Sequence, residues 1–288
     1  MAWWRNKKMK QEMIQEQKRS PVADTAFLPL IDMAAGACVP FVEFYARRLP
    51  VQMDPVGKSH LAESRYLGAE KVIEEKDLRQ IIELGAGFTP HYQNLNGEGL
   101  VDSYIEVDLP ENSEIKQGLL KQAVWDESMP TFVQGNVFDR KTWYSIGHHA
   151  FQNFSEEKPV GIFAEGFMQY TNPEQRKYLL DQMRPLLEEF GGFFFFEDSL
   201  TFHPEFSEIP EMRALSERMS KISKNDQLTN YISQEGLTHE FESYGFYVER
   251  MPAPLDNLTS RDLDDEGREV LSRFQHWILT PRPSEVLR

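Results

Sequence analysis

The apolar residues in the first quarter of the chain recur at helical spacing. Over Asp24–Leu49 their spacing predicts one or two helices, and Pro40 can split the pair. Leu61–Glu75 predicts a further helix that ends in a run of charged residues. We therefore expect an N-terminal arm and helices over residues 1–78, ahead of a second unit over residues 79–288.

From residue 80 onward, short apolar runs alternate with segments of helical pattern. Such alternation predicts an α/β fold with a mostly parallel sheet and right-handed crossovers. The last of these runs holds Phe193-Phe194-Phe195-Phe196, which is typical of a strand covered on both faces. The predicted strands are Gln80–Glu83, Val101–Val107, Thr131–Gln134, Val160–Ala164 and Gly192–Glu197. The helices between them are predicted near Pro90–Leu95, Ser113–Trp125, Arg140–Ile146 and Pro173–Glu189.

The alternation stops after the fifth predicted strand. Ser199–Asn230 contains a helix-like stretch, Glu211–Ile222, and we interpret the segment as an inserted lid at about residues 199–230. The last two strands are expected to pair antiparallel and so to close the sheet. Beyond the lid the pattern predicts a helix, a strand, an irregular connection and a final strand, at Gln234–Tyr244, Phe246–Met251, Pro252–Gly267 and Gln275–Thr280.

A glycine turn follows the first predicted strand directly. Gly85 and Gly87 have no Cβ, so the backbone can turn sharply there and a ligand can lie against it. The third glycine of the dinucleotide fingerprint would fall at Pro90 and is missing, which argues against NAD or FAD. Asp108 and Glu106 stand where a second parallel strand ends, and an acid there can accept hydrogen bonds from ribose hydroxyls. Together these features predict a site for a nucleoside without a diphosphate, of which S-adenosylmethionine is the common example, although a Gly-x-Gly turn alone can also be an ordinary loop.

Three motifs resemble the leucine carboxyl methyltransferase family, a branch of the class I methyltransferases that includes bacterial O-methyltransferases of polyketide pathways. They are Leu84-Gly85-Ala86-Gly87, Glu106-Val107-Asp108-Leu109-Pro110 and Ala164-Glu165-Gly166-Phe167-Met168-Gln169-Tyr170. The resemblance implies a Rossmann-like sheet, mostly parallel with a C-terminal antiparallel strand, and N-terminal cap helices that close over the cofactor and shape the substrate pocket. It also implies S-adenosyl-L-methionine as donor and S-adenosyl-L-homocysteine as product. This chain departs from the family pattern of an apolar residue and Asp-Thr-Arg after the turn, because it has Phe88-Thr89-Pro90-His91 there.

The resemblance assigns roles to single residues. It places Glu83 where an acid orders the turn or reaches the donor's ammonium, and Arg65 where an arginine pairs with the donor's carboxylate, unless Arg65 is a surface residue. Asn136 stands where the family has an aspartate that binds adenine, and its side-chain oxygen can accept the same hydrogen bond, unless it is a turn residue. The expected cofactor-binding residues are Arg65, Glu83, Gly85, Ala86, Gly87, Asp108, Leu109, Asn136, Val137, Glu165 and Tyr170.

Methyl transfer requires few catalytic groups. An in-line displacement at a sulfonium needs a donor and an acceptor held in line, and no metal. The adjacent pair His148-His149 points apart in most geometries, so we expect no metal site there. A carboxylate acceptor needs no general base, whereas a phenol benefits from one. The weak candidates for such a base are His203, Tyr231 and His239.

Composition limits the possible partners. The formal net charge of −15 repels phosphate backbones and argues against nucleic acid. The single Cys38 cannot form an internal disulfide, and with neither an apolar run of membrane-spanning length nor a secretory signal we expect a cytoplasmic protein. The basic stretch Met1–Arg19 is either a solvated arm or one that folds over the site or a partner, with Trp3 and Trp4 as anchors. Nothing in the composition indicates the oligomeric state.

These observations favour an S-adenosylmethionine-dependent O-methyltransferase acting on a small molecule, aromatic or polyketide-like. A carboxyl methyltransferase of a protein C-terminus and a non-catalytic S-adenosylmethionine-binding protein are the alternatives, since fold alone does not determine activity. A nucleotide-dependent oxidoreductase is disfavoured by the missing third glycine.

Overall fold

A computed structural model describes residues 21–50, 53–55, 57–122, 129–197, 210–224 and 233–283. The basic stretch Met1–Arg19 lies outside these residues. Of the expected lid, only its helix is described, as α10 (Pro210–Ser223). No helix in the described ranges is both long and apolar enough to cross a membrane.

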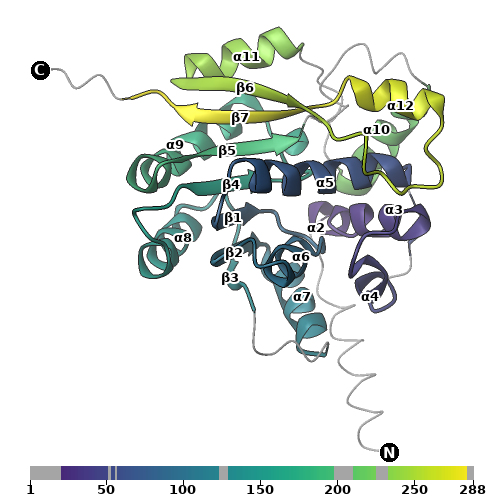
Figure 1. Ribbon diagram of the computed structural model, residues 1–288, viewed down its shortest axis with the longest axis horizontal. Coiled ribbons are helices and arrows are strands. Elements are labelled where there is room, and N and C mark those ends of the chain that lie inside the picture. The colour runs from purple at the N-terminus through teal and green to yellow at the C-terminus, as the bar shows by residue number, and fades with distance from the viewer. Residues whose placement is uncertain are drawn as a thin grey trace, which may run out of the picture.

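The centre of the molecule is a seven-stranded sheet with the order β3-β2-β1-β4-β5-β7-β6 (Figure 1). The first five strands run parallel, and β7 runs antiparallel to both of its neighbours. This arrangement confirms the predicted mostly parallel sheet with its antiparallel C-terminal strand. The strands are β1 (Gln80–Leu84), β2 (Ser103–Asp108), β3 (Thr131–Gln134), β4 (Val160–Ala164), β5 (Gly192–Glu197), β6 (Phe246–Pro252) and β7 (Gln275–Pro281).

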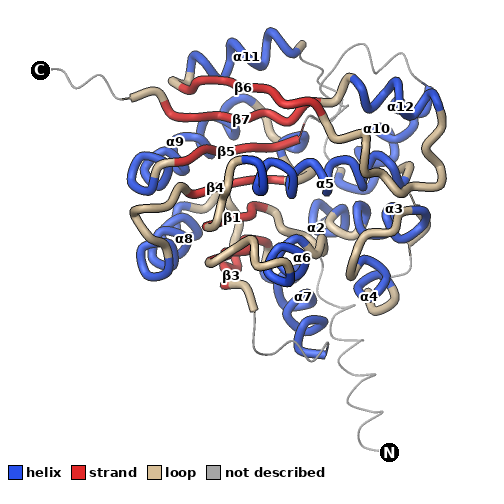
Figure 2. The backbone as a smooth tube through the Cα atoms, viewed as in Figure 1, coloured by secondary structure: helices blue, strands red, loops and turns tan. Residues whose placement is uncertain are grey.

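Helices flank the sheet, as Figure 2 shows. One helix, α12 (Asp265–Ser272), begins in the predicted irregular connection and was not expected. Its first turn is held by the Asp264 carboxylate, which accepts a hydrogen bond from Gly267 N at 2.8 Å, a common helix start. The helices of the alternating section and the one before β6 are α6 (His91–Gly97), α7 (Pro110–Gln122), α8 (Arg140–Asn153), α9 (Pro173–Phe190) and α11 (Gln234–Ser243), with a short 3₁₀ turn at Met168–Tyr170.

Both faces of the central strands are apolar because both are covered. Ile82, Phe194 and Phe196 belong to the core on one face, while Ile81 and Phe195 belong to the core on the other. The alternation follows from the two-residue period of a strand, which sends neighbouring side chains to opposite faces. The phenylalanine run is thus a core strand, as predicted, although its first member, Phe193, is only partly buried.

Four N-terminal helices form a helical cap, which we define as α2 (Pro21–Thr25), α3 (Leu28–Gly36), α4 (Val42–Ala46) and α5 (Ser59–Glu75). Figure 1 shows α2, α3 and α10 beyond the carboxyl ends of the parallel strands. An apolar cluster joins the cap to the glycine turn, where the rings of Phe27 and Phe88 stack with centroids 4.5 Å apart. The predicted break near Pro40 is present, and a second break separates α2 from α3.

The cap is tied to the C-terminal part of the chain by two carboxylates. Glu63, fully buried in α5, accepts hydrogen bonds from the backbone N–H and the hydroxyl of both Thr259 and Ser260. Asp262 in turn accepts from the backbone N–H and hydroxyl of Ser59 and from the backbone N–H of His60. The cap helix α5 is therefore held by a segment that lies about 200 positions later in the sequence.

Because Glu63 satisfies four donors at a buried site, we expect Glu63→Ala to lower the free energy of unfolding by about 3 kcal/mol, the cost of unpaired buried donors. Glu74, exposed on the same helix, provides the matched control, and Glu74→Ala should change stability by less than about 0.5 kcal/mol. Urea denaturation of both variants measures the difference. Equal stability of the two variants would contradict the structural role of the Glu63 carboxylate.

Candidate functional site

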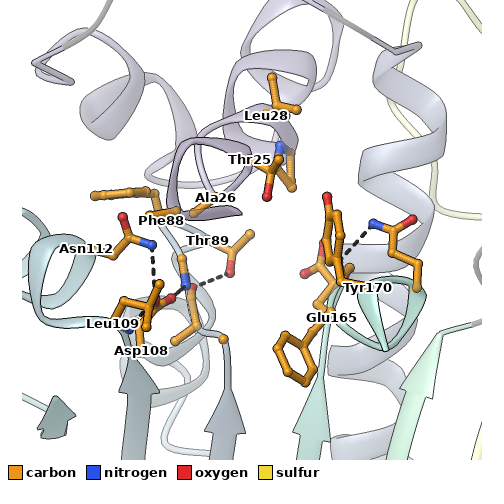
Figure 3. A pocket seen from close by; sticks show the side chains of 18 of the residues that line it. Thr25, Ala26, Leu28, Phe88, Thr89, Asp108, Leu109, Asn112, Glu165 and Tyr170 are labelled. Atoms are coloured by element: carbon orange, nitrogen blue, oxygen red, sulfur yellow. Dashed lines mark hydrogen bonds between the residues drawn. The ribbon is translucent and has the colours of Figure 1, made fainter. Parts of the chain in front are cut away.

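A cavity of about 450 Å³ lies at the carboxyl ends of β1, β2 and β4. The glycine turn and the strand ends form one wall, and side chains of α2, α3, α5 and α10 form the other (Figure 3). Ligands of open α/β sheets bind at this position. The volume falls in the range of roughly 300–1,000 Å³ that small-molecule sites occupy.

The turn after β1 has the backbone that its glycines predicted. Gly85 and Gly87 have φ values of 68° and 45°, in the left-handed region that residues with a Cβ rarely adopt. Both positions are also crowded, because a Cβ at Gly85 would lie 3.2 Å from the Phe167 ring and one at Gly87 would lie 3.3 Å from Ala26 O. The turn is thus packed between the cap and the segment after β4, so larger residues would displace its neighbours.

Asp108 at the end of β2 binds the turn. Its Oδ2 accepts from Gly87 N at 2.6 Å, and its Oδ1 accepts from Leu109 N at 2.6 Å and from Asn112 Nδ2 at 2.9 Å. Burial raises the pKa of this carboxyl, and the three hydrogen bonds oppose that rise. Each carboxylate oxygen has two lone pairs, so Oδ1 is fully used and Oδ2 can accept one more hydrogen bond.

The other two strand-end acids do not line the cavity. Glu106 pairs with buried Lys116 at 2.9 Å, which removes it as the alternative to Asp108. Glu83 accepts from the Tyr104 hydroxyl at 2.8 Å, and burial raises its pKa to about 7. Because Glu83 lies behind the turn, its geometry fits the role of ordering the turn and not that of contacting a ligand.

Glu165, after β4, is another acid in the cavity wall. His91 Nε2 lies 2.8 Å from Glu165 Oε2, and Arg65 Nη2 lies 3.9 Å from Glu165 Oε1. His91 is fully buried, with its ring stacked on Tyr66, and its Nδ1 lies 3.5 Å from Glu70 Oε1. Burial lowers the pKa of His91, but hydrogen bonds to Glu165 and Glu70 outweigh it and raise the pKa to about 10.

Asn136, Val137 and Tyr170 also line the cavity. Asn136 Oδ1 accepts a hydrogen bond from Phe138 N at 2.9 Å. This is the geometry of a turn residue, which was one of the two interpretations that the sequence allowed for Asn136. Burial raises the pKa of Tyr170 to about 12, and its side chain hydrogen-bonds with Thr25 and Gln169. Figure 3 shows Tyr170 and Glu165 on one side of the cavity and Asp108 on the other.

All predicted cofactor residues except Glu83 line this one cavity. Of the three candidate bases, His203 and Tyr231 lie outside the described residues. His239 lies on the surface of α11 with its side chain 81% exposed and is not part of the cavity wall. A direct role for His239 in the chemistry therefore has no geometric support.

Several cavity residues were not predicted. Asn112 and Phe167 could have been found, since they follow Asp108 and Glu165 within one helical turn or two positions. Thr25, Leu28 and Met219 carry no sequence signal, because they reach the cavity from α2, α3 and α10 only through the tertiary fold.

The sheet order, the glycine turn and the acid at the end of β2 together define the class I methyltransferase fold. Two solved structures are similar along most of their length. A DUF574 family protein from Streptomyces avermitilis has a TM-score of 0.58 and 15% identity, covering 92% of this chain and 99% of its own. A protein from Thermobifida fusca, described as a candidate methyltransferase, has a TM-score of 0.55 and 13% identity, covering 91% and 94%. At these identities the two structures show the fold alone.

Residues 47–184 match the family model of the leucine carboxyl methyltransferases. The match spans the last part of the helical cap, the glycine turn, Asp108 and the Glu165 motif, and it confirms the resemblance noted in the sequence. No curated protein matches the chain. Family match and fold identify the chain as an S-adenosylmethionine-dependent methyltransferase.

The raised pKa of His91 predicts a pH-dependent contribution to stability. Below about pH 6.5 the ring is protonated in both the folded and the unfolded protein, so its ion pairs contribute fully. As the pH rises through about 10 the folded protein loses that proton and the contribution disappears. The difference in Tm between the wild type and His91→Gln should therefore narrow from pH 6.5 to pH 10 in thermal scans. A constant difference would show that His91 is neutral in the folded protein.

Proposed function

We propose that this protein is an O-methyltransferase that transfers the methyl group of S-adenosylmethionine to a small molecule, aromatic or polyketide-like. The observation that carries this proposal is one cavity with two unlike walls. The strand ends place the carboxylates of Asp108 and Glu165 in one wall, with Arg65 of α5 beside Glu165, and these residues form the polar wall. The other residues of the helical cap and α10 are mostly apolar, apart from Thr25, Asp32 and Lys58, and form the apolar wall. The polar wall suits the donor and the apolar wall suits the acceptor.

The polar wall fits S-adenosylmethionine group by group. Asp108 Oδ2, with one remaining lone pair, would accept from a ribose hydroxyl, and Val137 would pack against the adenine. Within the described part of the chain, Glu165 Oε1 and Arg65 Nε are buried atoms without a hydrogen-bond partner. An ammonium beside Glu165 and a carboxylate beside Arg65 would satisfy them, and the methionine end of the donor carries both groups.

Bound S-adenosylmethionine supplies an electrophilic methyl group on a sulfonium. The contribution of the protein is to hold donor and acceptor in line and to exclude water from the space between them. Leu28, Pro29 and Leu61 from the cap and Met219 from α10 supply the apolar surface for that purpose. Such a surface favours a compact apolar acceptor over an extended, solvated peptide.

The acceptor oxygen determines whether a base is needed. A carboxylate is ionised at neutral pH, whereas a phenol has a pKa near about 10 and ionises only in part. His239 is remote from the cavity, so no histidine of the described ranges stands in the cavity wall. We therefore expect phenol methylation to speed up with pH as the phenolate forms, and carboxylate methylation to be insensitive to pH near neutrality.

The donor site can be tested by calorimetry with S-adenosylhomocysteine. Wild-type protein should bind it and give no heat with NAD, and Asp108→Ala should weaken binding by roughly 1–3 kcal/mol because the ribose and the turn both lose an acceptor. Asp102→Ala is the matched control, since Asp102 pairs with Arg79 and Lys158 on the surface beside the other end of β2. Unchanged affinity in Asp108→Ala would remove this carboxylate from the site.

The acceptor class can be tested with a panel of phenols, small carboxylic acids and a peptide ending in leucine, each with labelled S-adenosylmethionine. We expect turnover of phenolic or polyketide-like molecules, with a rate that rises with pH, and no turnover by Glu165→Gln with any acceptor. Turnover of the peptide alone would overturn the small-molecule proposal and favour methylation of a protein C-terminus.

A further inference from the structure

His91 lies directly behind Glu165, one of the acids in the cavity wall. Its ring is fully buried between α5 and the end of β4, and both of its nitrogens face carboxylates. Nε2 lies 2.8 Å from Glu165 Oε2, and Nδ1 lies 3.5 Å from Glu70 Oε1. Glu70 is held in place on its other oxygen by Asn94 Nδ2 at 2.8 Å.

This geometry favours an imidazolium, although His91 Nδ1 approaches Glu70 Oε1 only to 3.5 Å and makes no hydrogen bond with it. A neutral imidazole has one N–H and one lone pair, so one of its nitrogens would direct a lone pair at a carboxylate. A protonated ring instead directs an N–H at each carboxylate, with a hydrogen bond to Glu165 and a longer ion pair with Glu70. The surrounding charges also favour the protonated form of the His91 ring, because the acids near the ring outnumber the cations. They are Glu70 from α5, Glu83 from β1, Glu106 from β2 and Glu165 after β4, against Arg65 from α5 and Lys116 from α7.

The contact fixes one oxygen of Glu165 and leaves the other, which is buried, without a hydrogen bond. Oε2 accepts from His91, whereas Oε1 has no hydrogen-bond partner among the described residues and stands 3.9 Å from Arg65 Nη2. The Glu165 side chain is only 4% exposed, and Glu165 forms part of the cavity wall. A side chain buried at this depth is held in one orientation by its neighbours, and His91 makes the one short contact with this carboxylate that the described residues contain.

We propose that His91 is the positioning residue for the ammonium of the methyl donor. Its ring holds Glu165 Oε2 at 2.8 Å and so fixes the orientation of this carboxylate in the cavity wall, where it can receive the donor's amino group. This inference rests on the proposed donor site. It adds that His91 controls the binding of the amino-acid half of the donor and leaves the nucleoside half unaffected, because Asp108 lies on the other side of the cavity (Figure 3).

Two ligands distinguish binding of the amino-acid half of the donor from binding of its nucleoside half. S-adenosylhomocysteine has both halves, whereas 5′-methylthioadenosine keeps the adenosine and the sulfur but lacks the amino acid. Calorimetry on the full chain should show that His91→Gln weakens S-adenosylhomocysteine by about tenfold or more, as expected when a buried charge loses its partner, and leaves 5′-methylthioadenosine unchanged. Glu165→Gln should show the same selectivity. His148→Gln, an exposed histidine on α8, is the matched control and should bind both ligands as the wild type does.

Glu70→Gln provides a second variant in case His91→Gln does not fold. It removes one of the two carboxylates that hold the proton on His91, and it should reduce the affinity for S-adenosylhomocysteine selectively but less strongly. Equal weakening of both ligands in these variants would mean a general packing role and would overturn the inference, as would unchanged affinity for both. A wild-type protein that binds neither ligand would instead overturn the proposed donor site, and the inference with it.

Discussion

The structure depends on one carboxylate that joins three separate segments. Asp108 stands at the end of β2, and it accepts from Gly87 in the turn after β1, from its own neighbour Leu109 and from Asn112 in the first turn of α7. The turn can take its left-handed backbone only with glycine, and it can hold that backbone only with an acceptor for its N–H. The backbone conformation of the turn in the cavity wall therefore depends on a glycine and an acid together. Neither residue alone would fix that conformation.

The same region buries more acid than a core ordinarily contains, and each carboxylate is compensated locally. Glu106 has Lys116, Glu83 has the hydroxyl of Tyr104, and Glu165 has His91. Because these partners come from different elements, the acids also fix the positions of the strand ends relative to the flanking helices. Of these three acids only Glu165 is part of the cavity wall, and within the described residues its Oε1 has no hydrogen-bond partner.

The apolar wall of the cavity has a different origin. It is made by helices at the start of the chain and by Met219 in α10, and it is held over the sheet by contacts with residues near the other end of the chain. Glu63 binds Thr259 and Ser260 across that distance. The apolar wall therefore depends on the closure of the whole fold, whereas the strand-end wall depends on short segments of consecutive strands. Two walls built in such different ways can vary independently, and the matched family segment covers the strand ends, whereas much of the apolar wall lies outside it.

Features governed by neighbouring residues could be predicted from the sequence. The strand period, the glycine turn and the acid one strand later are local patterns, and they were enough for the sheet and for the donor side of the cavity. The helix after Asp264 was missed because its polar composition resembles a loop, and only its packing against α5 makes it part of the fold. Tertiary structure alone decided that Glu83 lies behind the turn, that His91 lies between Glu165 and Glu70, and that Thr25 reaches the cavity. These outcomes depend on burial and on charge pairing between distant segments, which the order of residues along the chain does not express.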